Sequence, residues 1–307
     1  MRADLFLFNS SFTYKDGITL DNLITQIKEL NNTIKYIKEH NSKFKINEDC
    51  IYKNDSIYYL EIYQNYTISN FLFTPEISIN IPHDIKKTFM ILLDRANTRN
   101  LNEQEVVDLV KSNSGSNLNG LLILHSINLD EHEIDSTVII KTKEQWYKFH
   151  RYFLAKNPID ELNFYNEARK YFTQINFHPH VEISLGRLEG GLERFAGSII
   201  YNLAQLNDKF KSYRNKYDLV ETLRRFSSEC NVDASLEGNA DKKPALTFVF
   251  TDDNSNPVQV CCEPHLKLSK SDSTGDTHFY YNRIYFHEGK PNIDKGKILV
   301  AHIGNHL

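Results

Sequence analysis

Apolar residues recur at the three- and four-residue spacing of an amphipathic helix in several parts of the chain. The clearest stretch covers residues 19–40, where Leu and Ile form one stripe and Lys residues occupy the opposite side. Capping signals at Thr142 and Asn157 begin two further helices. The remaining predicted helical stretches are 84–98, 102–111, 185–206 and 217–226.

Strand-like runs alternate with these helices. Residues 50–66 are rich in β-branched and aromatic residues, while 120–127 and 137–140 are apolar enough to be buried strands. Four more runs follow Ala245, separated by clusters of Asp, Asn, Ser, Gly and Pro. The pattern predicts an α+β protein: a mixed helical and β N-terminal region, followed by a C-terminal antiparallel β-rich module.

The chain of 307 residues is long enough for more than one domain. We expect a mixed region at 1–156, a helical region with a linker at 157–240, and the β-rich module at 241–307. The linker is placed at 229–243, where periodicity is lost and polar residues dominate. A module of about 65 residues is marginal alone, so it is expected to pack against the helices of 158–228.

Composition indicates an ordinary globular protein, with 40% hydrophobic and 25% charged residues. The net charge of -4 means that binding of nucleic acid must depend on a local basic patch. Four Cys, no signal peptide and no run of membrane-spanning length favour a cytoplasmic protein with no membrane partner. Phosphate loops and dinucleotide fingerprints are absent from the sequence, so no cofactor is expected.

The candidate chemistry lies in the last 65 residues, which hold five of the 12 His. Successive side chains on a strand point to opposite faces. In one run, alternation therefore puts Glu263, His265 and Lys267 on one face. In the next run it aligns Tyr281, Arg283, Tyr285 and His287. Neighbouring strands of this kind present an acid, a base, two cations and phenols together.

This set suits cleavage of a phosphodiester without a metal, with RNA as the favoured partner. The reaction needs a base for the 2′-hydroxyl, an acid for the leaving oxygen and cations for the phosphate. Glu263 and His265 are the expected base and acid, and Lys267 and Arg283 the phosphate clamp. His302 or His306 is an alternative acid. The expected catalytic set is completed by Tyr285 and His302, and the substrate-binding set is Tyr281, His287 and His306.

A resemblance adds to this interpretation. The strands Arg283-Ile-Tyr285-Phe and Lys297-Ile-Leu-Val-Ala-His302, with scattered basic residues, Tyr and His, resemble those of the RelE and barnase-type ribonuclease toxins. In these families, basic residues, an aromatic residue and a Glu or His on the sheet face perform the reaction. Arg283, Tyr285 and His302 match best. The resemblance implies a toxin or host-defence effector, with a possible regulatory protein partner.

Other hypotheses stay open at this point. The same face suits a non-enzymatic sensor that binds nucleic acid or another phosphate-containing ligand. Asp252, Glu263 and Lys267 form an imperfect version of a metal-dependent nuclease motif. A zinc site is a further alternative, with Cys261, Cys262 and His265 as ligands together with His302 and His306, which are four residues apart.

Overall fold

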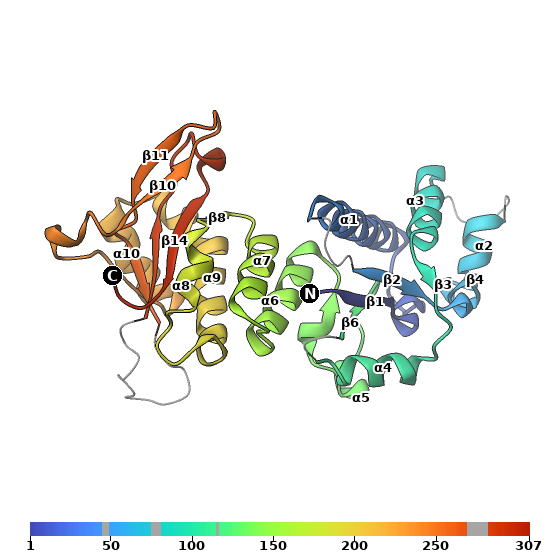
Figure 1. The fold of residues 1–307 in the computed structure, drawn as a ribbon. Helices are drawn as coiled ribbons and strands as arrows, with labels where there is room; N and C mark the ends of the chain where they lie inside the picture. The colour runs from blue at the N-terminus through green and yellow to red at the C-terminus, as the bar shows by residue number, and fades with distance from the viewer. Residues whose placement is uncertain (45–48, 75–80, 115–116, 269–281) are drawn as a thin grey trace. The chain divides into compact units, whose positions relative to one another are not determined.

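The computed structural model describes residues 1–44, 49–74, 81–114, 117–268 and 282–307. The chain divides into two compact units, Met1–Phe153 and Leu154–Leu307. Each unit has its own sheet and its own helices (Figure 1). The predicted α+β class is confirmed.

A five-stranded parallel sheet forms the centre of the first unit, in the order β5-β2-β1-β6-β7. Its first strand is central, as in doubly wound α/β folds. Gly120 allows this sheet to pack tightly, because a Cβ there would lie 2.9 Å from the Leu5 side chain and 3.2 Å from that of Phe149. The strands are β1 (Ala3–Leu7), β2 (Cys50–Lys53), β5 (Asn97–Thr98), β6 (Leu118–Leu122) and β7 (Ile139–Ile140).

Helices cover both faces of this sheet, with α1 and α3 on one side and α4 and α5 on the other (Figure 1). A small hairpin, β3 (Glu61–Tyr63) with β4 (Tyr66–Thr67), lies outside the sheet. The helices are α1 (Leu20–Phe44), α2 (Ile68–Phe73), α3 (His83–Asp94), α4 (Glu103–Lys111), α5 (Leu129–His132) and α6 (Lys143–Lys156). Three short 3₁₀ turns lie at η1 (Asn9–Phe12), η2 (Asp55–Tyr59) and η3 (Ser136–Val138).

Local sequence signals explain where these helices begin and end. Asn102 caps α4 and forms a capping box with Glu105, as the predicted start at 102 requires. Thr142 and Gln145 form the expected hydrogen bonds at the start of α6. The helix expected to run to residue 98 ends at Asp94 instead, because Asn97–Thr98 pairs with β2.

The second unit has a sheet in the order β8-β14-β13-β12-β9. Four of its strands are antiparallel neighbours, and β8 pairs with β14 in parallel. The strands are β8 (Ile175–Phe177), β9 (Asp233–Ser235), β12 (His265–Lys267), β13 (Arg283–His287) and β14 (Ile298–Gly304).

Helices α9 and α10 pack on one face of this sheet, where Phe210 contacts both Phe226 and Phe286. The predicted continuous helix at 185–206 is wrong at its start. Gly190 and Gly191 take positive φ values of 93° and 80°, which end the helical path before Leu192. The helices are α7 (Glu161–Tyr171), α8 (His180–Leu185), α9 (Leu192–Arg214) and α10 (Leu219–Cys230), with 3₁₀ turns η4 (Ala240–Lys242) and η5 (Asp294–Gly296).

A hairpin of β10 (Thr247–Thr251) and β11 (Pro257–Cys261) packs over the opposite face of the sheet. The hairpin and the sheet meet in an apolar cluster made of Leu246, Phe250, Val260, Cys262, Tyr285, Ile293, Leu299 and Ala301. The segment expected as a linker, 229–243, contributes the edge strand β9 to the sheet. Residues 157–240 and 241–307 therefore share one sheet and one compact unit.

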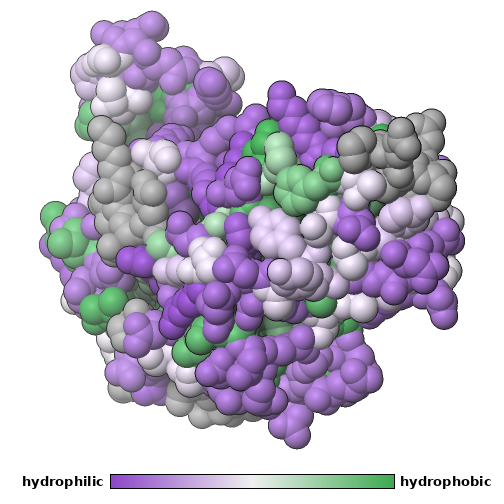
Figure 2. Space-filling view, turned by 90° about the vertical axis from the view of Figure 1, so that its right-hand side faces the viewer, coloured by the Kyte–Doolittle hydropathy of each residue, from purple (hydrophilic) through white to green (hydrophobic). Residues whose placement is uncertain are grey.

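Figure 2 shows one face of the molecule, on which hydrophilic residues predominate and hydrophobic residues form small separate groups. Such scattered apolar groups are normal on a protein surface. Among the described helices, none combines the length and the apolar character needed to cross a bilayer.

Candidate functional site

The β-register brings several predicted site residues into one row across the second sheet. His265 of β12 lies opposite Tyr285 of β13, which in turn lies opposite His302 of β14. Their rings touch in sequence, with centroid distances of 5.2 Å and 5.7 Å. Ser235 of β9 extends the row, and its hydroxyl lies 3.0 Å from Nε2 of His265. Alternation along two runs predicted the shared face of His265 and Tyr285, but it did not place Ser235 or His302 there.

Cations and their partners form a second row beside the first. Lys267 lies opposite both Arg283 and Asp233, and its ammonium is 3.2 Å from the Asp233 carboxylate. Arg283 lies opposite Gly304, and its guanidinium donates a hydrogen bond to the Asn282 carbonyl. Burial is the largest effect on the pKa values of the ring row; the positive charge of Arg283 adds to the lowering of the His265 pKa and opposes the rise in the Tyr285 pKa.

Burial determines the protonation of the ring row. His265 and Arg283 are each 5% exposed, and Tyr285 and His302 are fully buried. Burial lowers the pKa of His265 and brings that of His302 down to about 4, while it raises the pKa of Tyr285. Both imidazoles are therefore neutral at pH 7. The rings of His265, Tyr285 and His302 are thus enclosed, and Tyr285 packs in the apolar cluster beneath the β10–β11 hairpin.

The solvent-reachable rim of the row is built by residues from two other segments. The His306 ring lies 6.4 Å from that of Tyr285, centroid to centroid. Its Nε2 is 3.4 Å from the Glu237 carboxylate, and its Nδ1 is 3.1 Å from the Lys242 ammonium. The side chain of His306 is 26% exposed. We call Glu237, Lys242 and His306 the rim triad.

The charges around His306 set its proton affinity. Burial is the largest effect and lowers its pKa; Lys242 and Arg283 lower it further, and Glu237 raises it. An ammonium donates hydrogen bonds only. Nδ1 must therefore be the acceptor facing Lys242, and the Nε2 proton faces Glu237. In this tautomer Nδ1 carries the lone pair that a general base needs.

Other predicted residues lie apart from the rim triad. The Glu263 carboxylate pairs with Lys243 at 3.2 Å, and the contact between Glu263 and the His265 ring is made by its backbone carbonyl. His287 points toward a different end of the sheet, where Nδ1 accepts a hydrogen bond from the Gly289 amide. Tyr281 lies outside the described residues.

Sequence reasoning missed Glu237 and Lys242. Both belong to the polar, aperiodic stretch that was interpreted as a linker. Glu237 comes two residues after the end of β9, and Lys242 ends η4. The only available signal was the short alternation of Asp233 and Ser235 ahead of them, which is too brief to indicate a strand by itself.

The structure separates Asp252, Glu263 and Lys267, the three residues of the hypothesis of a metal-dependent nuclease. Asp252 lies at the tip of the β10–β11 hairpin, where its carboxylate accepts hydrogen bonds from the amides of Asn254 and Asn256. Glu263 follows the far end of β11, and its carboxylate pairs with Lys243. These side chains do not form a joint site with Lys267.

The zinc alternative meets a similar difficulty. Cys262 is fully buried in the apolar cluster, where burial raises the pKa of its thiol, so the thiolate that zinc requires is disfavoured. Within the described ranges, no group of three or more His, Cys, Asp or Glu side chains is arranged to hold a metal ion.

The low proton affinity of His302 predicts acid sensitivity of the second unit. The unfolded chain binds a proton at this site below about pH 6.5, whereas the folded chain binds one only near pH 4. The contribution of His302 to the free energy of unfolding is therefore full above pH 6.5, and it decreases by about 3 kcal/mol as the pH falls to 4. Urea unfolding, monitored by circular dichroism at several pH values, measures this change in the free energy of unfolding. The fluorescence of Trp146 reports on the first unit separately.

The matched variant for this prediction is His302→Gln, which keeps a side-chain N–H for the Asn305 carbonyl that His302 Nε2 now contacts at 2.8 Å. We expect its stability to change less with pH between 6.5 and 4 than that of the wild type. Equal pH dependence in both proteins would contradict the assignment.

The first unit contains a separate pocket, of about 510 Å³, between the sheet and α4, which extends from Arg99 after β5 toward the amino ends of β1 and β6. Ligands of open α/β sheets usually bind at the opposite edge, beyond the carboxyl ends of the strands. Here the protein's own side chains occupy part of that edge: Asn9 bonds Ser56, and Asn54 bonds the Leu101 carbonyl. The pocket found there is only about 20 Å³ in volume.

Comparisons with known proteins do not place the chain in a family: no family model, no curated protein and no solved structure matches it.

Proposed function

We propose that the second unit is a metal-independent ribonuclease whose reacting groups are the rim triad and Arg283. The observation that carries the proposal is the position of His306, which Glu237 and Lys242 hold from two sides, next to a buried arginine. This arrangement has a base, an orienting carboxylate and two cations. A role as a toxin or host-defence effector, with RNA as the partner, belongs to the same proposal.

The geometry supports a specific division of roles. RNA phosphate attracts Lys242 away from Nδ1 of His306, and Nδ1 then takes the proton from the 2′-hydroxyl. The 2′-oxygen forms a bond to phosphorus as the bond from phosphorus to the 5′-oxygen breaks. Lys242 gives the leaving oxygen its proton, and Arg283 stabilises the charge on the phosphate. Glu237 stabilises the imidazolium that forms at His306.

The buried row supports this rim instead of reacting. His265 already uses both ring nitrogens, with Nε2 at Ser235 and Nδ1 near the Glu263 carbonyl. Nε2 of His302 donates a hydrogen bond to the carbonyl of Asn305, and Asn305 is the residue directly before His306. His265, the expected acid, and His302, one of its two alternatives, thereby become positioning residues for the sheet and for the segment that carries His306.

The direct test of this function is cleavage of an RNA oligonucleotide and of a DNA oligonucleotide with the same sequence, each with and without a chelator. We expect cleavage of RNA only, with 2′,3′-cyclic phosphate and 5′-hydroxyl ends, because the mechanism uses the 2′-hydroxyl. Cleavage of DNA, loss of activity with chelator, or intact RNA after long incubation would refute the proposal.

The proton affinity of His306 is expected to shift in opposite directions in two variants. Glu237→Gln removes a charge that raises the His306 pKa, so the pKa should fall. Lys242→Met removes a charge that lowers it, so the pKa should rise. Titration of the His306 ring by NMR measures both without requiring activity. Shifts of the same sign, or no shift, would show that these residues do not flank the ring.

A further inference from the structure

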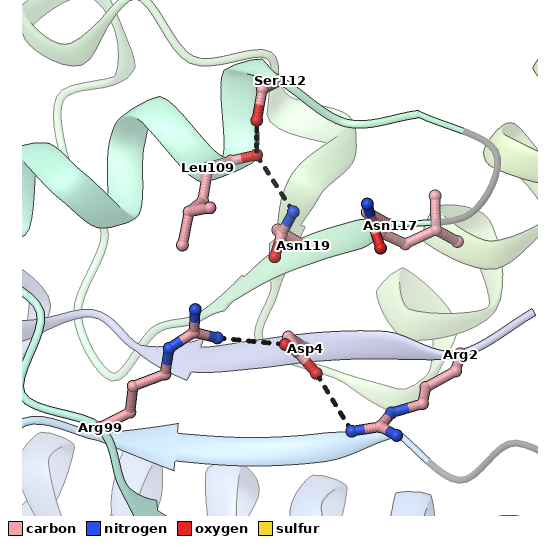
Figure 3. Close-up of a pocket in the computed structure, with 8 residues that line it drawn as sticks. Arg2, Asp4, Arg99, Leu109, Ser112, Asn117 and Asn119 are labelled. Carbon is pink, nitrogen blue, oxygen red and sulfur yellow. Dashed lines mark hydrogen bonds and ion pairs between the residues drawn. The ribbon is translucent and has the colours of Figure 1, made fainter.

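The pocket of the first unit has the charges of an anion-binding site. It lies between the parallel sheet and the end of α4 (Figure 3). Asp4 of β1 stands between two arginines: Nη1 of Arg99 is 3.2 Å from its carboxylate, and Nη2 of Arg2 is 3.7 Å from it. Two guanidinium groups and one carboxylate give the pocket a net charge of about +1.

Arg99 is held in place by the sheet beneath it. The rings of Phe6 and Tyr52 stack at 5.5 Å, and the guanidinium lies 5.5 Å from each centroid. A guanidinium that is already fixed loses little conformational entropy when it binds a ligand. It offers five N–H donors, and only Nη1 is used by Asp4. The Arg99 side chain remains 39% exposed, and that of Arg2 52% exposed.

The opposite wall of the pocket supplies polar groups. Asn117 and Asn119 stand at the start of β6, and Ser112 follows α4. The Asn119 amide is fixed by hydrogen bonds to the Leu109 carbonyl and to Asn113. Asn117 is exposed. In Figure 3 these side chains and the two arginines border the same space.

We propose that this pocket binds a nucleoside monophosphate. Nη2 of Arg2 already donates a hydrogen bond to Cys50 Sγ at 3.0 Å. The phosphate binds the remaining donors of Arg2 and those of Arg99, because the planar guanidinium fork matches phosphate oxygens. Asp4 accepts hydrogen bonds from sugar hydroxyls, and the exposed face of the Arg99 plane stacks on the base. A volume of about 510 Å³ lies in the range of small-molecule sites. The inference does not rest on RNA cleavage by the second unit.

Calorimetric titration of the full chain with adenosine 5′-monophosphate tests whether the pocket binds a nucleoside monophosphate. Arg99→Gln and Arg2→Gln should each weaken binding about tenfold or more, which is the usual effect of losing a charge-assisted hydrogen bond. Lys87→Gln is the matched control, since Lys87 is exposed on α3, on the other side of the sheet from α4, and its change removes the same charge.

Three other ligands separate the possible outcomes. Adenosine, inorganic phosphate and succinate should each bind at least about tenfold more weakly than the monophosphate. Equal affinity for adenosine or for phosphate would refute a nucleotide site, and equal affinity for succinate would indicate a carboxylate site instead. Absence of binding at millimolar concentration, or equal weakening by Lys87→Gln, would also overturn the inference.

Discussion

His306→Gln is expected to lower the rate of RNA cleavage by about two to four orders of magnitude, which is the usual contribution of a general base. Gln keeps a polar side chain of similar reach but cannot take up a proton. Because His306 is partly exposed at the edge of the sheet, the change should leave the fold intact. Cleavage rates under single-turnover conditions, with thermal unfolding measured in parallel, give both quantities.

The matched control for this effect is His83→Gln. His83 is exposed at the first residue of α3, in the other unit. Its substitution should not change the rate. If His306→Gln retained more than about half of the wild-type rate, or if His83→Gln caused an equal loss, His306 would not be the base.

Asp49→Ala is expected to destabilise the first unit by about 3 to 5 kcal/mol, because each buried donor left without its acceptor costs about 1 to 3 kcal/mol. The Asp49 carboxylate accepts hydrogen bonds from Nε1 of Trp146 at 2.8 Å, from the Ala3 amide at 2.9 Å and from Nε2 of His150 at 2.9 Å. Burial alone would raise its pKa, but these contacts together hold the pKa below its ordinary value. The substitution leaves three buried donors without this acceptor.

Urea unfolding followed by fluorescence of Trp146, the single Trp of the chain, measures this loss. Asp16→Ala is the matched control, because Asp16 is exposed. Its substitution should change stability by less than about 0.5 kcal/mol. A cost below about 1 kcal/mol for Asp49→Ala would show that the carboxylate does not link β1 to α6.

Helical periodicity and capping residues were sufficient to predict α1, α4 and the start of α6, because these signals are local. The strand β1 was missed, since Ala3–Leu7 is buried almost throughout and shows no alternation of polar and apolar residues. The break between α8 and α9 was missed for a different reason. Glycine lowers helix stability only modestly. Leucines at helical spacing before and after the two glycines therefore favoured one continuous helix over a turn.

For the candidate site, too, local patterns in the sequence were predictive and tertiary contacts were not. Alternation along β12 and β13 placed His265, Lys267, Arg283 and Tyr285 on one face, as the register now shows. It did not reveal that the β10–β11 hairpin packs over Tyr285, because this contact joins segments that the tertiary fold brings together. In the proposed mechanism the buried His265 and His302 are supporting residues, whereas Arg283 remains a reacting group. The rim triad depends on Glu237, whose segment has no periodic pattern.

Chemical rescue tests the central claim, that the His306 imidazole is the base of an RNA-cleaving site, most directly. A His306→Ala protein should cleave RNA slowly, and added imidazole should restore cleavage in proportion to its concentration, because the free base replaces the missing ring. The same imidazole should not accelerate the wild type. A folded His306→Ala protein that stays inactive at all imidazole concentrations, or that cleaves RNA at the wild-type rate without it, would contradict the account.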